Sequence, residues 1–211
     1  MYKLYWCANT GAFAAQAVLV EAGVAHELIE TDTGTGAHRD PSYLAVNPRG
    51  QIPALVLPDG SVMTESAALI LHLVDAHPEA GLAPAPGSAA RAQFDRWLLY
   101  TAVDLYGADL RYYYPDRHTS DPAGAPAVKQ NGLACMEQGF GLTEAHLAAH
   151  GPFMMGPAYS ALDVYLIMVA QWHPDTADLL SRHPHLARLH AAVKARPAVA
   201  QIWAQNFPDE G

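Results

Sequence analysis

Cysteine, positive charge and long apolar runs are all scarce in this sequence. Cys7 and Cys135 are the only cysteines among 211 residues, too few for a disulfide framework and typical of a reducing compartment. Lys and Arg number 12 against 21 Asp and Glu, and the net charge of −9 argues against a nucleic-acid partner. No apolar run has the length of a membrane span, and the chain opens on a strand pattern instead of a signal peptide. We therefore expect a cytoplasmic protein with no membrane partner.

Apolar residues are abundant, and proline and glycine are concentrated in one place. Hydrophobic residues make up 51% of the chain and charged residues 16%, which is typical of a globular protein with one large or two small domains. A linker composition appears between residues 78 and 87, at Pro78, Gly81, Pro84, Pro86 and Gly87. We expect an N-terminal domain at 1–78, a linker at 79–87 and a second domain at 88–211.

Strand and helix patterns alternate before this linker. Alternating and aromatic residues predict strands, and alanine-rich or apolar stretches between turn residues predict helices. The expected strands are 2–6, 26–30, 54–57 and 61–63, and the expected helices are 12–22, 41–45 and 65–76. One parallel crossover followed by a hairpin and a helix indicates a small mixed α/β sheet with helices on both faces.

Only helical patterns follow the linker. We expect long helices from Ser88 to about residue 114 and from 127 to about 150, and shorter ones at 160–172, 185–195 and 197–205. Ser160 and Asp163 form a capping box at the start of the helix at 160–172. The second domain is therefore predicted to be an all-helical bundle.

The most informative stretch is Asn47-Pro48-Arg49-Gly50-Gln51-Ile52-Pro53-Ala54-Leu55, a turn that runs into a short apolar strand. A cis bond before Pro53 would leave the N–H and C=O of Ile52 free to pair with an extended ligand. Glu65 and Ser66 then open an apolar helix. An acidic side chain, a hydroxyl and a helix N-terminus suit a ligand with an amine and a carboxylate.

The N-P-x-G-x-I-P-A-L segment, the strand pair after it and Glu65-Ser66 resemble the glutathione-binding half of the cytosolic glutathione transferases. The resemblance extends along almost the whole chain. It implies a thioredoxin-like N-terminal domain, an all-helical C-terminal domain, a homodimer, a role in detoxification and glutathione as co-substrate. The implied glutathione-binding residues are Ile52, Pro53, Glu65 and Ser66. Gln51 is our candidate for binding the glycyl carboxylate because the motif fixes its position, and His38 or Arg39 in the preceding loop is the alternative.

The loop from Cys7 to Gly11 departs from the patterns of that family. Counting back from the end of the first helix, Asn9 falls where several classes have a catalytic Ser, and Gly11 falls where the beta class has its Cys. A hydroxyl or amide donor beside the glutathione sulfur would lower the thiol pKa from ~8.5 by favouring the thiolate. We predict that Asn9 and Thr10 do this, with Thr10 favoured for its hydroxyl. A backbone N–H of the loop, or Cys7, is the alternative.

The resemblance also implies a second-substrate pocket on the first helix of the bundle. Tyr106, Tyr113 and Trp172 are the candidate residues, although packing within the bundle or at a dimer interface is the alternative for each. Eleven histidines include His183, His185 and His190, which are close in sequence. We assign the His183-Pro184-His185 segment to capping and surface positions and predict no metal site.

The leading function is a glutathione transferase that activates the thiol for attack on a small hydrophobic electrophile. A glutathione-dependent disulfide reductase or isomerase is the alternative within the same fold, because a loop with Thr and Asn is compatible with a reaction in which glutathione supplies the sulfur. A non-catalytic protein that binds glutathione or an apolar ligand is the alternative outside enzymes. The missing Ser, Cys or Tyr at the matched positions favours that reading.

Overall fold

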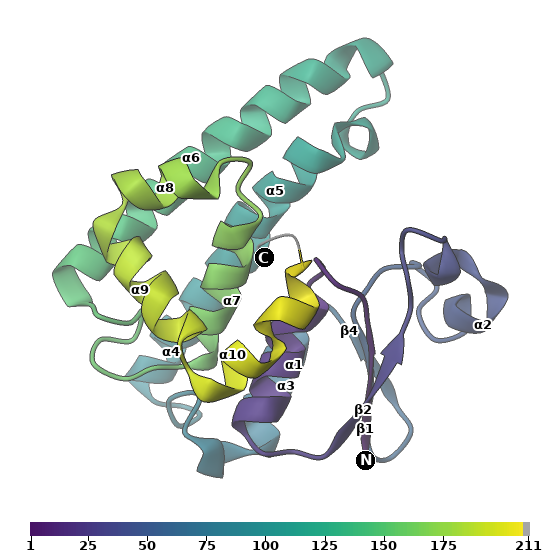
Figure 1. The fold of residues 1–211 in the computed structure, drawn as a ribbon, viewed down its shortest axis with the longest axis horizontal. Helices are drawn as coiled ribbons and strands as arrows, with labels where there is room; N and C mark the ends of the chain where they lie inside the picture. The colour runs from purple at the N-terminus through teal and green to yellow at the C-terminus, as the bar shows by residue number, and fades with distance from the viewer. Residues whose placement is uncertain (209–211) are drawn as a thin grey trace. The chain divides into compact units, whose positions relative to one another are not determined.

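The computed structural model describes residues 1–208 and divides them into two compact units (Figure 1). The first unit contains residues 1–83 and 194–208, and the second contains residues 84–193. The boundary between residues 83 and 84 falls within the predicted linker at 79–87. The C-terminal helix differs from the expectation, because the sequence pattern groups it with the bundle whereas the structure groups it with the first unit.

A four-stranded sheet in the order β2-β1-β3-β4 forms the centre of the first unit. Strands β1 (Tyr2–Trp6) and β2 (His26–Glu30) are parallel and are joined through helix α1 (Ala12–Glu21). Strand β3 (Ala54–Val56) is antiparallel to β1 and forms a hairpin with β4 (Val62–Thr64). The mixed α/β sheet expected from the sequence is confirmed.

Helices lie on both sides of this sheet. Figure 1 shows α1 and α3 (Ser66–Ala76) on one side and the short α2 (Pro41–Leu44) on the other. Helix α10 (Pro197–Asn206) packs on α1. Because α1 is covered by β1, α3 and α10, its residues from Ala12 to Leu19 are all buried. Two 3₁₀ turns, η1 (Ala37–Arg39) and η2 (Pro78–Ala80), complete the unit.

Within its described residues, the second unit is built from helices, and two isolated β-bridges lie in the turn at 153–158. The long helix expected from Ser88 is instead two helices, α4 (Ala89–Tyr100) and α5 (Tyr106–Tyr113), joined by a π-helical turn, η3 (Thr101–Leu105). Helix α8 was not predicted. The remaining elements are η4 (Pro115–His118), η5 (Pro122–Gly124), α6 (Ala125–His150), α7 (Ala161–Gln171), α8 (Thr176–Arg182) and α9 (Pro184–Lys194).

Glycine allows α6 to pack closely on the helix before it. A Cβ at Gly132 would lie 2.8 Å from the carbonyl oxygen of Ala108 and 2.9 Å from the amide nitrogen of Tyr112. A Cβ at Gly139 would lie 2.5 Å from a methyl carbon of Leu105. Gly132 therefore brings α6 against the backbone of α5, and α6 remains continuous through both glycines.

A buried carboxylate fixes the start of α7. Asp163 is fully buried and accepts hydrogen bonds from the Met154 amide at 2.8 Å, the Ser160 amide at 2.7 Å and the Ser160 hydroxyl at 2.9 Å. The predicted capping box is present. Burial raises the pKa of Asp163 to about 6, although these hydrogen bonds oppose the rise.

None of the helices described within residues 1–208 is long and apolar enough to cross a bilayer.

Candidate active site

Strand register brings three loop segments to one end of the sheet. Ala54 pairs with Tyr5 on one side and with Thr64 on the other. The end of β1, the start of β3 and the end of β4 therefore lie at the same edge. The loop after β1, the Ile52-Pro53 segment and Glu65 emerge there from three neighbouring strands.

The turn before Pro53 is held by hydrogen bonds to the carbonyl of Gln51. The side-chain amide of Asn47 donates to this oxygen at 2.7 Å, and the Tyr43 hydroxyl donates to it at 2.5 Å. The Gly50 amide also donates to the Asn47 carbonyl at 2.8 Å. Burial raises the pKa of Tyr43 to about 12, which keeps its hydroxyl a donor. No sequence pattern predicts this role for Tyr43, because the contact is made across the turn.

The Ile52–Pro53 peptide bond is cis. Ile52 lies outside the regular strand, which begins at Ala54. In residues 1–208, neither its N–H nor its C=O makes a hydrogen bond. This leaves one donor and one acceptor for an extended ligand.

Glu65 stands at the N-terminus of α3 in an unusual backbone conformation. Its φ of +67° is rare for a residue with a side chain, and such residues cluster at functional sites. The side chain is 64% exposed, with one carboxylate oxygen 3.3 Å from Nη1 of Arg49. Ser66 follows as the first helical residue and is buried. A carboxylate, a hydroxyl and the N-terminus of a helix therefore lie near Pro53.

His38 lies against the same turn from η1. Gly50 has a φ of +57°, and a Cβ there would lie 2.8 Å from the carbonyl oxygen of His38 and 2.9 Å from Nη1 of Arg39. Only glycine fits this close approach. Nδ1 of His38 is buried without a hydrogen-bond partner in the described chain. The structure thus brings His38 next to the Gln51 segment, but the contacts of its ring do not indicate a role.

In the loop from Cys7 to Gly11, the two candidate donors differ in the hydrogen bonds that their side chains already make. The Thr10 hydroxyl donates to the Cys7 carbonyl at 2.7 Å and accepts from the Ala12 amide at 3.3 Å, so its single proton is already used. Asn9 is exposed, has a φ of +55°, and donates its backbone N–H to the Asn206 carbonyl at 2.8 Å. Across residues 1–208, its side-chain amide makes no hydrogen bond.

Neither cysteine is fully buried. Cys7 is only partly buried, and its sulfur lies 3.7 Å from the Thr33 hydroxyl. Cys135 is also partly exposed on α6, where its thiol donates to the Asn131 side chain at 3.6 Å. Both thiols are free.

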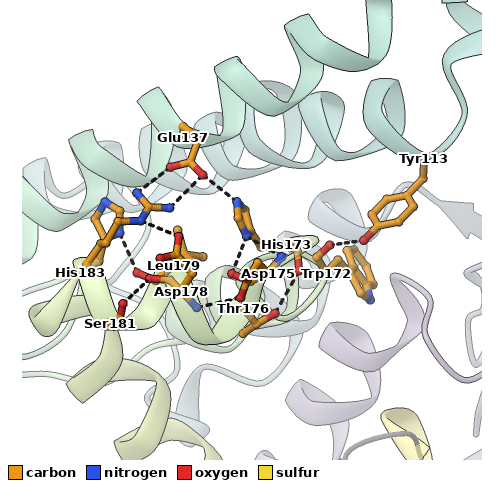
Figure 2. A network of polar contacts seen from close by, with 11 residues as sticks. Tyr113, Glu137, Trp172, His173, Asp175, Thr176, Asp178, Leu179, Ser181 and His183 are labelled. Atoms are coloured by element: carbon orange, nitrogen blue, oxygen red, sulfur yellow. Dashed lines mark hydrogen bonds and ion pairs between the residues drawn. The ribbon is translucent and has the colours of Figure 1, made fainter. Parts of the chain in front are cut away.

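In the helical unit, the three aromatic candidates lie together. The Tyr106 and Trp172 rings have centroids 5.0 Å apart, and the Tyr113 hydroxyl donates to the Trp172 carbonyl at 2.8 Å (Figure 2). Asp109 is buried and lies one helical turn from both tyrosines along α5. The sequence patterns did not identify this residue. Burial, with the Asp109 charge as a second cause, raises the pKa of Tyr113.

Polar contacts hold the turn that carries Trp172. His173 is buried, with Nε2 3.1 Å from a carboxylate oxygen of Glu137 and Nδ1 2.9 Å from the Asp175 carbonyl. Arg182 binds both oxygens of Glu137 at 2.9 Å, and these hydrogen bonds lower the Glu137 pKa against the opposing effect of burial. Figure 2 shows the side chains of Glu137 and His173 pointing toward each other. The network fixes α6 to the segment after α7.

The neighbouring histidines have other partners, and His183 is buried, contrary to the surface position expected from the sequence. His183 contacts the Leu179 carbonyl at 2.8 Å, His185 contacts Glu144 at 2.7 Å, and His190 contacts Gln171 at 3.1 Å. Within residues 1–208, no three His, Cys, Asp or Glu side chains gather in an arrangement that would hold a metal ion.

Comparison with known proteins gives a consistent picture. Residues 12–76 match the N-terminal domain of glutathione S-transferases, and residues 112–205 match the C-terminal domain. The chain is 27% identical to the glutathione S-transferase GstA of Escherichia coli O157:H7, covering 93% of this chain and 94% of the relative.

Solved structures agree over nearly the full length. A glutathione transferase from Methylococcus capsulatus is 32% identical with a TM-score of 0.86, covering 98% of both chains. A homologue from Sulfitobacter with bound glutathione is 26% identical with a TM-score of 0.89, covering 97% of this chain and 98% of that one. The chain belongs to the bacterial-type glutathione S-transferase family, with its thioredoxin-like unit and its helical unit.

Proposed function

We propose that the protein is a glutathione transferase that binds glutathione at the sheet edge defined by Ile52, Pro53 and Glu65. The observation that carries this proposal is the unpaired main chain of Ile52 beside a carboxylate and a helix N-terminus. The cysteinyl part of the tripeptide pairs with the N–H and C=O of Ile52 in the manner of an added strand. The bound glutathione in the Sulfitobacter homologue supports this ligand.

The ends of glutathione match the charges around this edge. The Glu65 carboxylate accepts from the γ-glutamyl ammonium, while the Ser66 hydroxyl and the N-terminal amides of α3 donate to the adjacent carboxylate. Arg49, which contacts Glu65, supplies a further positive charge at this end. Gln51, with His38 as second choice, binds the glycyl carboxylate. Tyr43 and Asn47 act indirectly, because they hold the Gln51 carbonyl.

We assign thiolate stabilisation first to the side-chain amide of Asn9. Its N–H groups are not used by other described residues, whereas the Thr10 proton is engaged with the Cys7 carbonyl. Donation to the sulfur lowers the thiol pKa by stabilising the charged form. Thr10 then supports the loop and orients Asn9, which reverses the preference drawn from the sequence. The thiolate attacks the electrophilic carbon, a C–S bond forms, and the bond to the leaving group breaks as that group departs with the electron pair, for example as halide from an aryl halide. Proximity of the two bound substrates adds to the acceleration.

For the second substrate we propose the surface formed by Tyr106, Tyr113 and Trp172. Their rings offer flat apolar area with polar groups at the rim, which suits a small hydrophobic electrophile. We further propose a homodimer in the cytoplasm and a role in detoxification, with no metal cofactor.

The test combines binding with a panel of substrates. Calorimetry should give saturable glutathione binding that Ile52→Pro abolishes, because proline removes the main-chain donor at this position. The purified protein is then assayed with glutathione and an aryl halide, a mixed disulfide or a peroxide. Turnover of the aryl halide alone supports the transferase, and turnover of the disulfide alone supports the reductase alternative. Binding without any turnover would replace the enzyme by a binding protein.

A further inference from the structure

The C-terminal helix contacts the loop that carries Asn9. The carbonyl of Asn206, the last residue of α10, accepts the Asn9 N–H at 2.8 Å. The two residues are far apart in the sequence but belong to the same compact unit. Because Asn9 has a φ of +55°, this hydrogen bond helps to hold a conformation that a side-chain-bearing residue rarely adopts.

Asn206 is itself firmly anchored. It is fully buried, and its side-chain amide donates to Oε1 of Gln16 at 2.8 Å and to the Ile202 carbonyl at 3.0 Å. Gln16 is also buried and donates to Gln205 at 3.2 Å. The carbonyl that receives the Asn9 N–H is therefore fixed from α1 as well as from α10.

The other contacts of α10 reinforce this anchoring. Arg196, just before α10, forms a two-point ion pair with Glu21, with both distances 2.7 Å. At the other end, the Phe13 ring packs against Trp203 at 5.5 Å and Phe207 at 5.0 Å between centroids. Helix α10 is thus attached along the whole length of α1.

Asn206 is not the residue that would stabilise this position best. Its Oδ1 is buried without a hydrogen-bond partner among the described residues, and an unsatisfied buried oxygen costs folding free energy. An apolar side chain would avoid that cost but would lose the bond to Gln16. Polar residues retained in a core at a cost are expected where they serve function.

We propose that Asn206 is a positioning residue, whose anchored carbonyl holds the Asn9 backbone and thereby aims the Asn9 amide at the glutathione sulfur. This inference rests on the proposed function, because it assumes that Asn9 donates to the thiolate. The C-terminal helix thereby supports the active-site loop through its main chain.

The test is the ultraviolet thiolate absorbance of bound glutathione against pH, in the parent protein, Asn9→Ala and Asn206→Ala. We expect Asn206→Ala to lose about half of the depression of the thiol pKa, and kcat/KM to fall about tenfold at a nearly unchanged KM for glutathione. Gln16→Met should act in the same direction, because it removes the acceptor for Asn206 without touching the loop. A full depression of the pKa in both variants would overturn the inference.

Two controls separate positioning from stability. Gln201→Ala removes an exposed amide from the same helix, and Leu186→Ala destabilises the other unit from a buried position. Both should leave the thiol pKa as in the parent protein. If the parent itself shows no depression, the proposed function fails, and the inference with it, whereas a depressed pKa that Asn206→Ala does not change refutes only the inference.

One measurement does not require a variant. The Asn9 N–H should exchange with deuterium slowly in the parent protein, because it is bonded to Asn206. Exchange at the rate of a free loop amide would overturn the inference even if Asn206→Ala failed to fold.

Discussion

Asp109 makes the folding stability of this protein depend on pH in an unusual direction. The residue is 4% exposed, and its Oδ1 has no hydrogen-bond partner among the residues described. Burial raises the pKa of this carboxyl group to about 7. An unfolded chain returns it to an ordinary value of about 4. Between these two values, the folded protein holds a proton that the unfolded chain releases.

The sign follows from that proton. Stability falls with rising pH wherever the folded state binds more protons, so the Asp109 contribution declines from about pH 4 to about pH 7 and is then constant. The difference between the two pKa values corresponds to a loss of about 4 kcal/mol in unfolding free energy. Asp109→Asn removes the ionisation and keeps the shape, so it should remove this loss.

Urea unfolding of the parent and Asp109→Asn at several pH values measures the effect. The free-energy difference between them should shift in favour of the variant by about 4 kcal/mol between pH 4 and pH 8. Asp104→Asn, an exposed acid in the adjoining π turn, controls for the loss of one charge. Parallel pH curves for the parent and Asp109→Asn would refute the reasoning.

Further predictions concern packing, capping and binding. Gly132→Ala should lower stability by about 1–3 kcal/mol in thermal unfolding, because its Cβ would meet the α5 backbone. Gly141→Ala, which has open space, should raise stability by about 0.5–1 kcal/mol; equal effects at the two sites would contradict the packing. Asp163→Ala should cost about 3 kcal/mol or more, because it leaves three buried donors unpaired, and a smaller loss in denaturant unfolding would count against the cap. Glu65→Gln should raise the glutathione Kd about tenfold by calorimetry, and an unchanged Kd would remove Glu65 from the proposed site.

The sheet was predictable because its signals are local. Alternating residues from Tyr2 to Trp6, the glycine turn before Ser61 and the stop at Gly23 each depend on neighbours in sequence. The π turn and α8 were not predictable in this way. The π turn continues an unbroken helical pattern, and α8 has only seven residues.

The candidate site was predictable as a motif and not as a set of contacts. Gln51, Ile52 and Glu65 come from a short pattern, and strand register brings them to one edge. The support of Gln51 by Tyr43 and the link from Asn9 to Asn206 connect segments that no local pattern relates. The sequence favoured Thr10 as the donor because it has a hydroxyl. In the structure that hydroxyl donates its proton to the carbonyl of Cys7, three residues away.

The most direct test of the central claim is the pKa of the glutathione thiol in the complex, followed by thiolate absorbance in the parent, Asn9→Ala and Thr10→Ala proteins. We predict a value below the ~8.5 of a free thiol in the parent. Asn9→Ala should remove most of the depression, and Thr10→Ala should remove less of it. A thiol pKa in the parent equal to that of free glutathione would contradict the account.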